Sequence, residues 1–170
     1  MDLKTYLRDV PDFPKPGILF KDISPLLAEP KAMKHVIERM AQMVFEGQVD
    51  RIAAIESRGF LFGAPLAVHL GVGFTPIRKR GKLPWRTNRI EYALEYGTDV
   101  LEMHQDGVQA GHRVLLVDDL LATGGTMKAA CELVEGVGGK VIGCAFVVEI
   151  RALGGRAKLQ PRRIHSLVEA

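Results

Sequence analysis

The sequence predicts a single α/β domain in which helices flank a mainly parallel sheet, and two observations support this prediction. Short apolar runs that suit buried strands occupy residues 51–55, 113–117 and 140–148, and near-continuous apolar runs are typical of parallel strands covered on both faces. Segments with helical spacing separate these runs, and an alternation of strands and helices is typical of α/β folds. The 170 residues fit one domain, 1–170, because single domains usually span about 100–200 residues.

Each further element follows from a local pattern. Residues 1–30 contain five prolines and predict an irregular hood over the core. A helix is expected over 33–44, where apolar residues recur at steps of three and four. Residues 60–70 predict a second helix, and 73–77 are a weaker strand candidate. A third helix is expected over 126–137, where a pair of glycines follows its end.

Composition excludes several broad classes of protein. Hydrophobic residues make up 47% of the chain and charged residues 25%, which excludes an intrinsically disordered protein. The sequence has no run of about 18 apolar residues, which a membrane-spanning helix needs, and its start lacks a secretory signal pattern. Its two cysteines lie in apolar segments and provide neither a disulfide framework nor a zinc cluster. We therefore expect a cytoplasmic protein with no membrane partner.

The net charge of +3 hides one strongly basic segment. Residues 78–89 contain six lysines and arginines and no acid, so the remainder of the chain is net acidic. Nucleic-acid binders usually spread their basic residues over a face or along a helix, whereas a concentrated cluster suits a compact anion at least as well. We therefore expect a small anionic ligand, and no nucleic acid, as the partner.

The most informative segment is residues 114–126, in which an apolar strand ends in two carboxylates and a loop with two glycines precedes a helix. Ligands of open α/β sheets bind at the carboxyl ends of the strands. A glycine-rich loop that opens a helix offers backbone N–H groups to an anion. We expect a phosphate monoester on the loop, and ribose hydroxyls or a magnesium ion at the carboxylates. The residues concerned are Asp118, Asp119, Ala122, Thr123, Gly124, Gly125 and Thr126.

Two alternatives to this interpretation exist. The acid pair could be a solvated strand end followed by an ordinary turn. Response-regulator receivers also carry an acid pair after an apolar strand, but near the start of the chain and without a Gly-Gly-Thr loop. The Walker lysine motif and the Gly-x-Gly-x-x-Gly pattern of dinucleotide folds are both absent.

Residues 114–126 resemble the phosphoribosyl-pyrophosphate motif of type I phosphoribosyltransferases, in the form carried by adenine-specific members of the family. The resemblance implies that Asp118 and Asp119 hold the ribose hydroxyls and that residues 122–126 hold the 5′-phosphate. It also implies that phosphoribosyl pyrophosphate and adenine react to give AMP and pyrophosphate. Mg²⁺ is the implied cofactor, held by the substrate rather than by a direct protein ligand, and a homodimer is the implied assembly.

A second turn, residues 56–60, follows the first buried strand. Ser57, Arg58 and the amide of Gly59 are donors that suit a second anion. The segment resembles the pyrophosphate loop of the family, which often has a non-proline cis peptide near its start. The alternative is that Ser57 simply caps the next helix.

The basic segment is expected to form a mobile loop over residues 77–84, because Gly81 and Pro84 interrupt it. A loop rich in lysine and arginine can close over a pyrophosphate and exclude water, although a solvated or nucleic-acid-binding face is the commoner explanation of a basic cluster. The segment resembles the catalytic loop of the family, which implies that Glu95 exchanges a proton with the purine and that Tyr96 shapes the closed loop. Glu91 and Tyr92 compete for these roles, residues 85–90 have no assigned role, and the predicted pyrophosphate ligands here are Arg78, Lys79 and Lys82.

The hood contains Phe20, whose flat ring could stack on a purine or could equally belong to the core. The segment is similar to the adenine-recognising hood of the family. By that comparison the backbone of Leu19 reads the base edge, Phe20 stacks on the base and Arg58 contributes from beneath. Lys21 lies where family members contact the neighbouring subunit.

Two other functions compete with adenine phosphoribosyl transfer. One is transfer to another base, such as xanthine or orotate. The other is a non-enzymatic regulator that keeps the fold as a ligand sensor. Glu95 and the hood favour the adenine enzyme, and the sequence lacks the added DNA-binding segment that a regulator usually needs.

Overall fold

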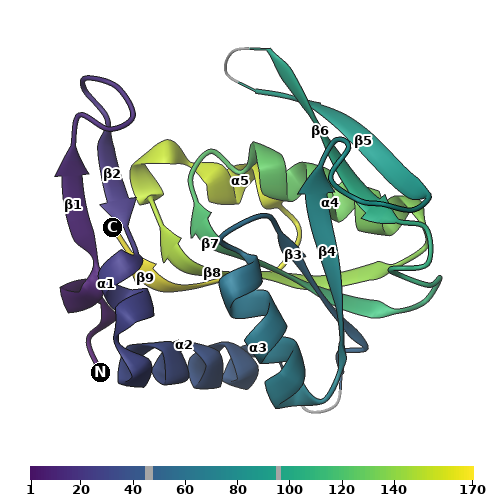
Figure 1. The fold of residues 1–170 in the computed structure, drawn as a ribbon, viewed down its shortest axis with the longest axis horizontal. Coiled ribbons are helices and arrows are strands. Elements are labelled where there is room, and N and C mark those ends of the chain that lie inside the picture. Colours follow the sequence, from purple (N-terminus) through teal and green to yellow (C-terminus); the bar gives the residue numbers. More distant parts are fainter. Residues whose placement is uncertain (45–47, 95–96) are drawn as a thin grey trace.

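The computed structural model describes residues 1–44, 48–94 and 97–170. Figure 1 shows a central sheet with helices on both faces and a small hairpin at one end of the molecule. The elements, in chain order, are η1 (Leu3–Tyr6), β1 (Arg8–Pro11), β2 (Leu19–Asp22), α1 (Ser24–Ala28), α2 (Pro30–Met43), β3 (Arg51–Ile55), α3 (Phe60–Leu70), β4 (Gly73–Lys79), β5 (Thr87–Ala93), β6 (Thr98–His104), β7 (Arg113–Leu121), α4 (Gly125–Gly136), β8 (Lys140–Glu149), η2 (Arg151–Leu153), α5 (Gly155–Leu159) and β9 (Ile164–Glu169).

The main sheet confirms the predicted fold class. Its seven described strands have the order β5-β6-β4-β3-β7-β8-β9. Five neighbouring strands are parallel: β4, β3, β7, β8 and β9. Strand β6 is antiparallel to β4, and β5 is antiparallel to β6. The predicted strands over 51–55, 113–117 and 140–148 are β3, β7 and β8, and the weaker candidate over 73–77 is β4.

Two apolar cores lie on the two faces of this sheet. On one face, α2 and α3 pack with the hood against β3, β7 and β8, and Val36, Phe62 and Leu66 are fully buried there. On the other face, α4 and α5 cover β4, β6 and β7, and Met127 and Leu159 are buried. The three-layer arrangement follows from strands that are apolar on both sides and therefore need cover on both.

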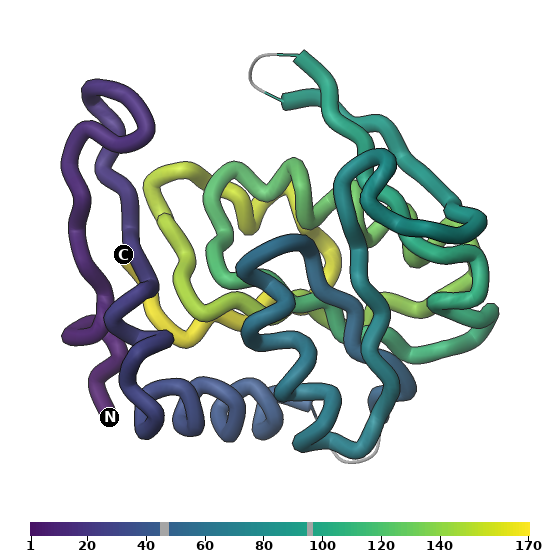
Figure 2. Tube along the Cα trace, in the orientation of Figure 1, coloured from purple at the N-terminus to yellow at the C-terminus, as the bar shows by residue number. Residues whose placement is uncertain are grey.

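The structure corrects three expectations drawn from the sequence. The hood is not irregular, since β1 and β2 form an antiparallel hairpin and α1 follows it. The basic segment is not one loop over residues 77–84, because β4 continues through Lys79. The residues beyond it include β5 and β6, which pair antiparallel. Strand β7 does not stop at residue 117 but runs to Leu121, because β8 pairs with it that far. In Figure 2 the hood hairpin and the β5–β6 hairpin project from two ends of the molecule.

Candidate active site

The candidate site lies where β3 and β7 end side by side. The two strands are parallel, with Ala54 opposite Val117, so the turn that follows β3 and the two carboxylates of β7 reach the same edge of the sheet. A cavity of about 240 Å³ opens there. It is lined by Ile55, Glu56, Ser57, Arg58, Lys79, Asp118, Asp119, Leu120, Leu121, Ala122, Thr123, Gly124, Gly125, Thr126, Met127 and Phe146.

The two carboxylates at this edge are tied to each other and to an arginine. Asp119 is 3% exposed, and its Oδ2 lies 2.8 Å from Nε of Arg58. Oδ1 of Asp118 accepts a hydrogen bond from the backbone N–H of Asp119 at 2.9 Å. Burial raises the pKa of both carboxyls; the charge of Asp119 raises that of Asp118 further, whereas Arg58 opposes the rise at Asp119. The pair therefore offers acceptor oxygens that suit neighbouring hydroxyls.

The turn after β3 approaches β7 closely. A Cβ placed on Gly59 would lie 2.5 Å from the carbonyl oxygen of Ile55 and 3.0 Å from Oδ1 of Asp118, so a side chain there would push the turn away from β7. The Glu56–Ser57 peptide is cis, as the family resemblance implies. Ser57 does not cap α3, whose N-cap is Gly59, and it lines the cavity instead.

The glycine loop connects β7 to α4 and forms the other wall of the cavity. Gly124 has φ +81° and is the N-cap of α4, a backbone conformation that glycine adopts without steric cost. The N–H groups of the first helical turn have no partner within a helix and point out of its amino terminus. Together with the hydroxyls of Thr123 and Thr126, these N–H groups are donors that suit an anion.

The three basic residues predicted to bind pyrophosphate from the basic segment differ in their position relative to the cavity. Lys79 lines the cavity, and its ammonium group pairs with Asp99 of β6. Arg78 forms an ion pair with Glu56, in which Nε of Arg78 lies 2.9 Å from Oε2 of Glu56. Lys82 is exposed, and its carbonyl oxygen accepts from Nη1 of Arg78 at 3.2 Å. The structure therefore brings Lys79, but not Arg78 or Lys82, to the cavity.

The hood reaches the site through a contact between a cation and an aromatic ring. The guanidinium carbon of Arg58 lies 5.4 Å from the centroid of Phe20, an attractive arrangement for a cation and a ring face. Phe13 packs edge-on against Phe20 with centroids 5.1 Å apart. Leu19 is exposed, and Lys21 pairs with Asp9 across the hood hairpin at 2.6 Å. Arg58 thus joins the hood to Asp119.

Comparison with known proteins assigns the chain to a family. The model of the phosphoribosyl transferase domain matches residues 22–166. The chain belongs to this family. The adenine phosphoribosyltransferase of Acetivibrio thermocellus is 55% identical over 170 residues, which covers 99% of each chain. That of Rhodopirellula baltica is 52% identical over 169 residues, covering 99% of this chain and 82% of the relative.

Solved structures agree with this assignment. The adenine phosphoribosyltransferase of Thermoanaerobacter pseudethanolicus has a TM-score of 0.96 at 54% identity and covers 99% of this chain and 98% of its own. The enzyme of Saccharomyces cerevisiae, solved with an imino-altritol bisphosphate and adenine, has a TM-score of 0.92 at 41% identity and covers 98% of this chain and 96% of its own. The family predicted from the acid pair and the glycine loop is confirmed.

The structure adds one residue that the sequence did not indicate, Asp99, and places Tyr92, which competed for the predicted catalytic role, near the glycine loop. Burial raises the pKa of the Tyr92 phenol on β5, and the side chain of Thr126 in the glycine loop opposes this rise. The hydroxyl of Tyr92 lies 3.5 Å from Oδ2 of Asp99. The alternation of Arg89, Ile90, Glu91 and Tyr92 was the available signal for this strand. The predicted catalytic residues Glu95 and Tyr96 lie outside the described residues.

Proposed function

We propose that this phosphoribosyl transferase domain is an adenine phosphoribosyltransferase, which transfers the 5-phosphoribosyl group of phosphoribosyl pyrophosphate to N9 of adenine and yields AMP and pyrophosphate. One observation carries the proposal: two glycine turns on adjacent strands face one cavity, with two carboxylates between them. The more than 50% identity to adenine phosphoribosyltransferases over the whole chain supports adenine as the base. The proposed reaction is purine salvage.

The substrate would lie across the cavity from one turn to the other. The 5′-phosphate suits residues 122–126, where helical N–H groups and hydroxyls converge. The ribose hydroxyls would donate to Asp118 and Asp119. The pyrophosphate suits Ser57, Arg58 and Lys79. The Ser57 hydroxyl can donate to it, and the positive charges of Arg58 and Lys79 attract its negative charge. Phe20 would stack on adenine from the hood, and its contact with Arg58 places it beside the site.

Catalysis would come from charged side chains that lie next to the groups on which charge develops during the reaction. Cleavage of the bond between C1 and the pyrophosphate leaves a sugar with oxocarbenium character, and Lys79 would offset the charge that accumulates on the leaving group. N9 of adenine then attacks C1 from the opposite face, and the proton on the purine must leave. Glu95 is the proposed acceptor of that proton and Tyr96 its neighbour, on the strength of the family resemblance.

Mg²⁺ fits a site held mainly by the substrate. Asp118 and Asp119 are carboxylates at the cavity, but across residues 1–44, 48–94 and 97–170 no group of three or more His, Cys, Asp and Glu side chains is arranged to hold a metal. A magnesium ion would take its ligands from pyrophosphate and ribose oxygens and from water. When bound, magnesium neutralises negative charge on the pyrophosphate.

The direct test is an assay for base preference. The protein is incubated with magnesium, phosphoribosyl pyrophosphate and one base at a time: adenine, hypoxanthine, guanine, xanthine or orotate. We expect AMP from adenine and at most traces of nucleotide from the other bases. Nucleotide formation from another base but not from adenine would overturn the proposal, as would no nucleotide from any base.

A cytoplasmic location is proposed because both cysteines are buried free thiols, Cys131 and Cys144, with sulfurs 3.6 Å apart. Free thiols of this kind suit a reducing compartment. In the described part of the chain, none of the helices has the length and apolar character needed to cross a membrane.

A homodimer is proposed because one helix is apolar on its outer side. Leu61 and Val68 of α3 lie seven residues apart on the same helical face and are 43% and 82% exposed. A helix that is apolar all round is usually buried, and a second copy of this chain would bury this one. The family resemblance, which places Lys21 near a neighbouring subunit, supports the same assembly.

Val68→Glu should convert the proposed dimer to monomer, because a carboxylate buried in an apolar contact costs several kcal/mol. Light scattering after size exclusion at micromolar protein measures the mass. Gln109→Glu, which adds the same charge in an exposed turn, is the control and should stay dimeric. A wild-type monomer, or a Val68→Glu variant that remains dimeric, would contradict the assignment of this face.

Asp99→Asn should strengthen pyrophosphate binding about fivefold, because two opposite charges at contact in water attract by about 1 kcal/mol and Asp99 holds Lys79 when no ligand competes. Asp99 raises the pKa of Lys79. Without it the pKa falls back towards the ordinary lysine value of about 10.4, so the ammonium stays charged in the variant at neutral pH. Calorimetry with pyrophosphate measures the affinity, and Asp106→Asn, an exposed change of the same charge, controls for net charge. Unchanged or weaker binding would exclude this competition.

A further inference from the structure

The glycine loop is supported from behind by the first residue of α5. A Cβ placed on Gly155 would lie 2.2 Å from the carbonyl oxygen of Ala122 and 2.9 Å from the backbone nitrogen of Gly124. A Cβ on Gly124 would in turn lie 2.5 Å from the carbonyl oxygen of Gly155. The two backbones are therefore in direct contact, and the position of α5 determines where the proposed phosphate loop can lie.

Helix α5 cannot hold this position by itself. It has five residues, and helices shorter than about 12 residues are marginal without tertiary contacts. Leu159 anchors one end of α5 in the core, where it is fully buried. The other end carries Arg156, next to Gly155, so the contacts of Arg156 set the end of α5 that touches the loop.

Arg156 is held by a buried carboxylate. Glu149, the last residue of β8, is 2% exposed. Nε of Arg156 donates to Oε1 of Glu149 at 3.0 Å, and Nη2 donates to Oε2 at 2.5 Å, so the pair is bidentate. Arg156 lowers the pKa of Glu149, which keeps the carboxylate charged at neutral pH.

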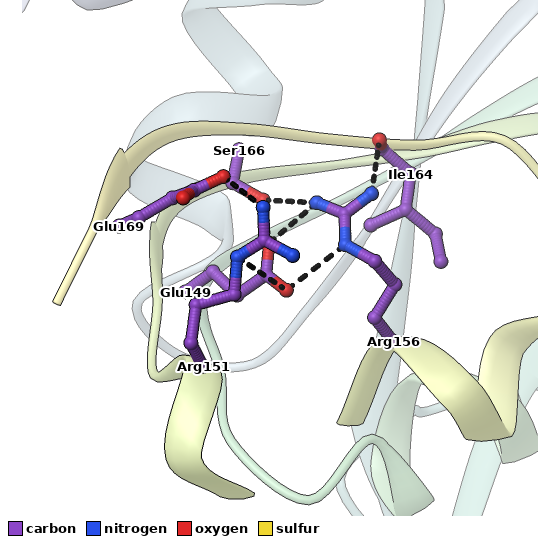
Figure 3. Close-up of polar contacts among 6 residues, drawn as sticks. All are labelled: Glu149, Arg151, Arg156, Ile164, Ser166 and Glu169. Atoms are coloured by element: carbon purple, nitrogen blue, oxygen red, sulfur yellow. Dashed lines mark hydrogen bonds and ion pairs between the residues drawn. The ribbon is translucent and has the colours of Figure 1, made fainter. Parts of the chain in front are cut away.

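Strand β9 completes the cluster. Nη1 of Arg156 donates to the carbonyl oxygen of Ile164 at 3.0 Å and Nη2 donates to Oγ of Ser166 at 3.1 Å. Ser166 also donates to Glu149. Figure 3 shows these contacts among Glu149, Arg151, Arg156, Ile164, Ser166 and Glu169. The guanidinium is thus fixed on two sides, by β8 and by β9.

Pairing of β7 with β8 also places Glu149 beside the start of the glycine loop. Glu149 is opposite Leu121, the last residue of β7, and the backbone N–H of Ile150 donates to the carbonyl oxygen of Leu121 at 2.9 Å. The loop begins with the next residue, Ala122. The cluster therefore fixes the start of the loop through β8 and its back through α5.

We propose that Glu149 and Arg156 are positioning residues for the 5′-phosphate, acting through the backbone contact between Gly155 and the loop. The inference rests on the proposed function, which places that phosphate on residues 122–126. It assigns a role to two side chains that do not line the cavity.

The test compares two ligands that occupy opposite ends of the cavity. Arg156→Lys keeps the charge but loses the bidentate fork, and Gly155→Ala disturbs the loop without touching the ion pair. Each should weaken ribose 5-phosphate binding about tenfold, since a misplacement of 1 Å can cost about a hundredfold. Pyrophosphate affinity should stay within about twofold of wild type, because its proposed site is the other turn. Calorimetry gives both affinities, and the melting temperature shows that each variant is folded.

Arg113→Lys is the matched control. Arg113 makes a similar bidentate pair, with Nε 2.9 Å and Nη2 2.8 Å from the carboxylate of Asp50, but at the start of β7, away from the loop. It should leave both ligand affinities unchanged. In the ligand-free protein, the amide resonances of Gly124 and Gly125 should shift in Arg156→Lys and not in Arg113→Lys.

The outcomes separate this inference from the proposed function. If wild-type protein binds ribose 5-phosphate, equal losses for both ligands in Arg156→Lys and Gly155→Ala, or no loss for either, overturn the positioning role alone. If wild-type protein binds no ribose 5-phosphate, the proposed function fails and takes the inference with it.

Discussion

Asp119→Asn is expected to lower kcat/KM for phosphoribosyl pyrophosphate about a hundredfold, because the variant loses a buried charged acceptor, and hydrogen bonds to charged groups contribute up to about 3 kcal/mol. The carboxylate of Asp119 is 3% exposed and lies 2.8 Å from Nε of Arg58. An asparagine amide would leave Arg58 unpaired, and Arg58 is also the contact with Phe20 of the hood. Both the ribose and the base ends of the proposed site should therefore suffer. Initial rates and calorimetry with the substrate measure the two effects.

Asp118→Asn is the control for this prediction, and its effect should be much smaller. The pKa of Asp118 is raised by burial first and by the neighbouring Asp119 second, so replacing its charge by a neutral amide costs less there than at Asp119, where Arg58 opposes the rise. Oδ1 can still accept from the N–H of Asp119. Equal losses from Asp118→Asn and Asp119→Asn would contradict the distinct roles of the two carboxylates.

The raised pKa of Asp118 also determines how the stability of the protein changes with pH. A carboxyl whose pKa is raised in the folded state contributes stability below its unfolded pKa and loses that contribution as pH rises through its folded pKa. Asp118→Asn removes this loss. The melting temperature of Asp118→Asn relative to wild type should therefore rise as pH increases from the unfolded to the folded pKa of Asp118. A difference that is constant with pH would contradict the raised pKa of Asp118.

The strands that the sequence predicted most clearly are those that helices cover on both faces of the sheet. Strands β3 and β8 lie between two helical layers, so their residues are apolar almost without interruption, as in Ile52–Ile55. Strands β5 and β9 lie at the two edges of the sheet, where one face or one side is open to solvent. Their polar residues, such as Arg89 and Ser166, break the apolar runs, and this concealed both strands.

The same reasoning applies to the site. Asp118, Asp119 and the glycine loop are contiguous in sequence, so their spacing alone indicated an anion site. Gly155 follows the loop by about 30 residues along the chain, and only the path through β8 returns it to Ala122. Asp99 meets Lys79 because β6 is antiparallel to β4, a pairing that no local pattern announces. Contacts that depend on topology rather than on neighbouring residues were therefore missed.

Gly124→Ala should abolish most of the affinity for ribose 5-phosphate, with a loss of about a hundredfold for a loop displacement near 1 Å. Two separate costs act at this position. The backbone has φ +81°, where alanine pays about 1–2 kcal/mol, and the new Cβ would lie 2.5 Å from the carbonyl oxygen of Gly155. The first cost acts on stability, whereas the second moves the loop itself.

Gly71→Ala separates the two costs. Gly71 also has a left-handed backbone, with φ +67°, but a Cβ there would have nothing within 4 Å. It should lower the melting temperature without changing ribose 5-phosphate affinity, whereas Gly124→Ala should change both and leave pyrophosphate affinity near wild type. If the two variants were equally destabilised but bound ribose 5-phosphate alike, the contact between the loop and α5 would have no influence on phosphate binding. Calorimetry on the pair therefore tests whether the back of the loop, and not only its conformation, is part of the site.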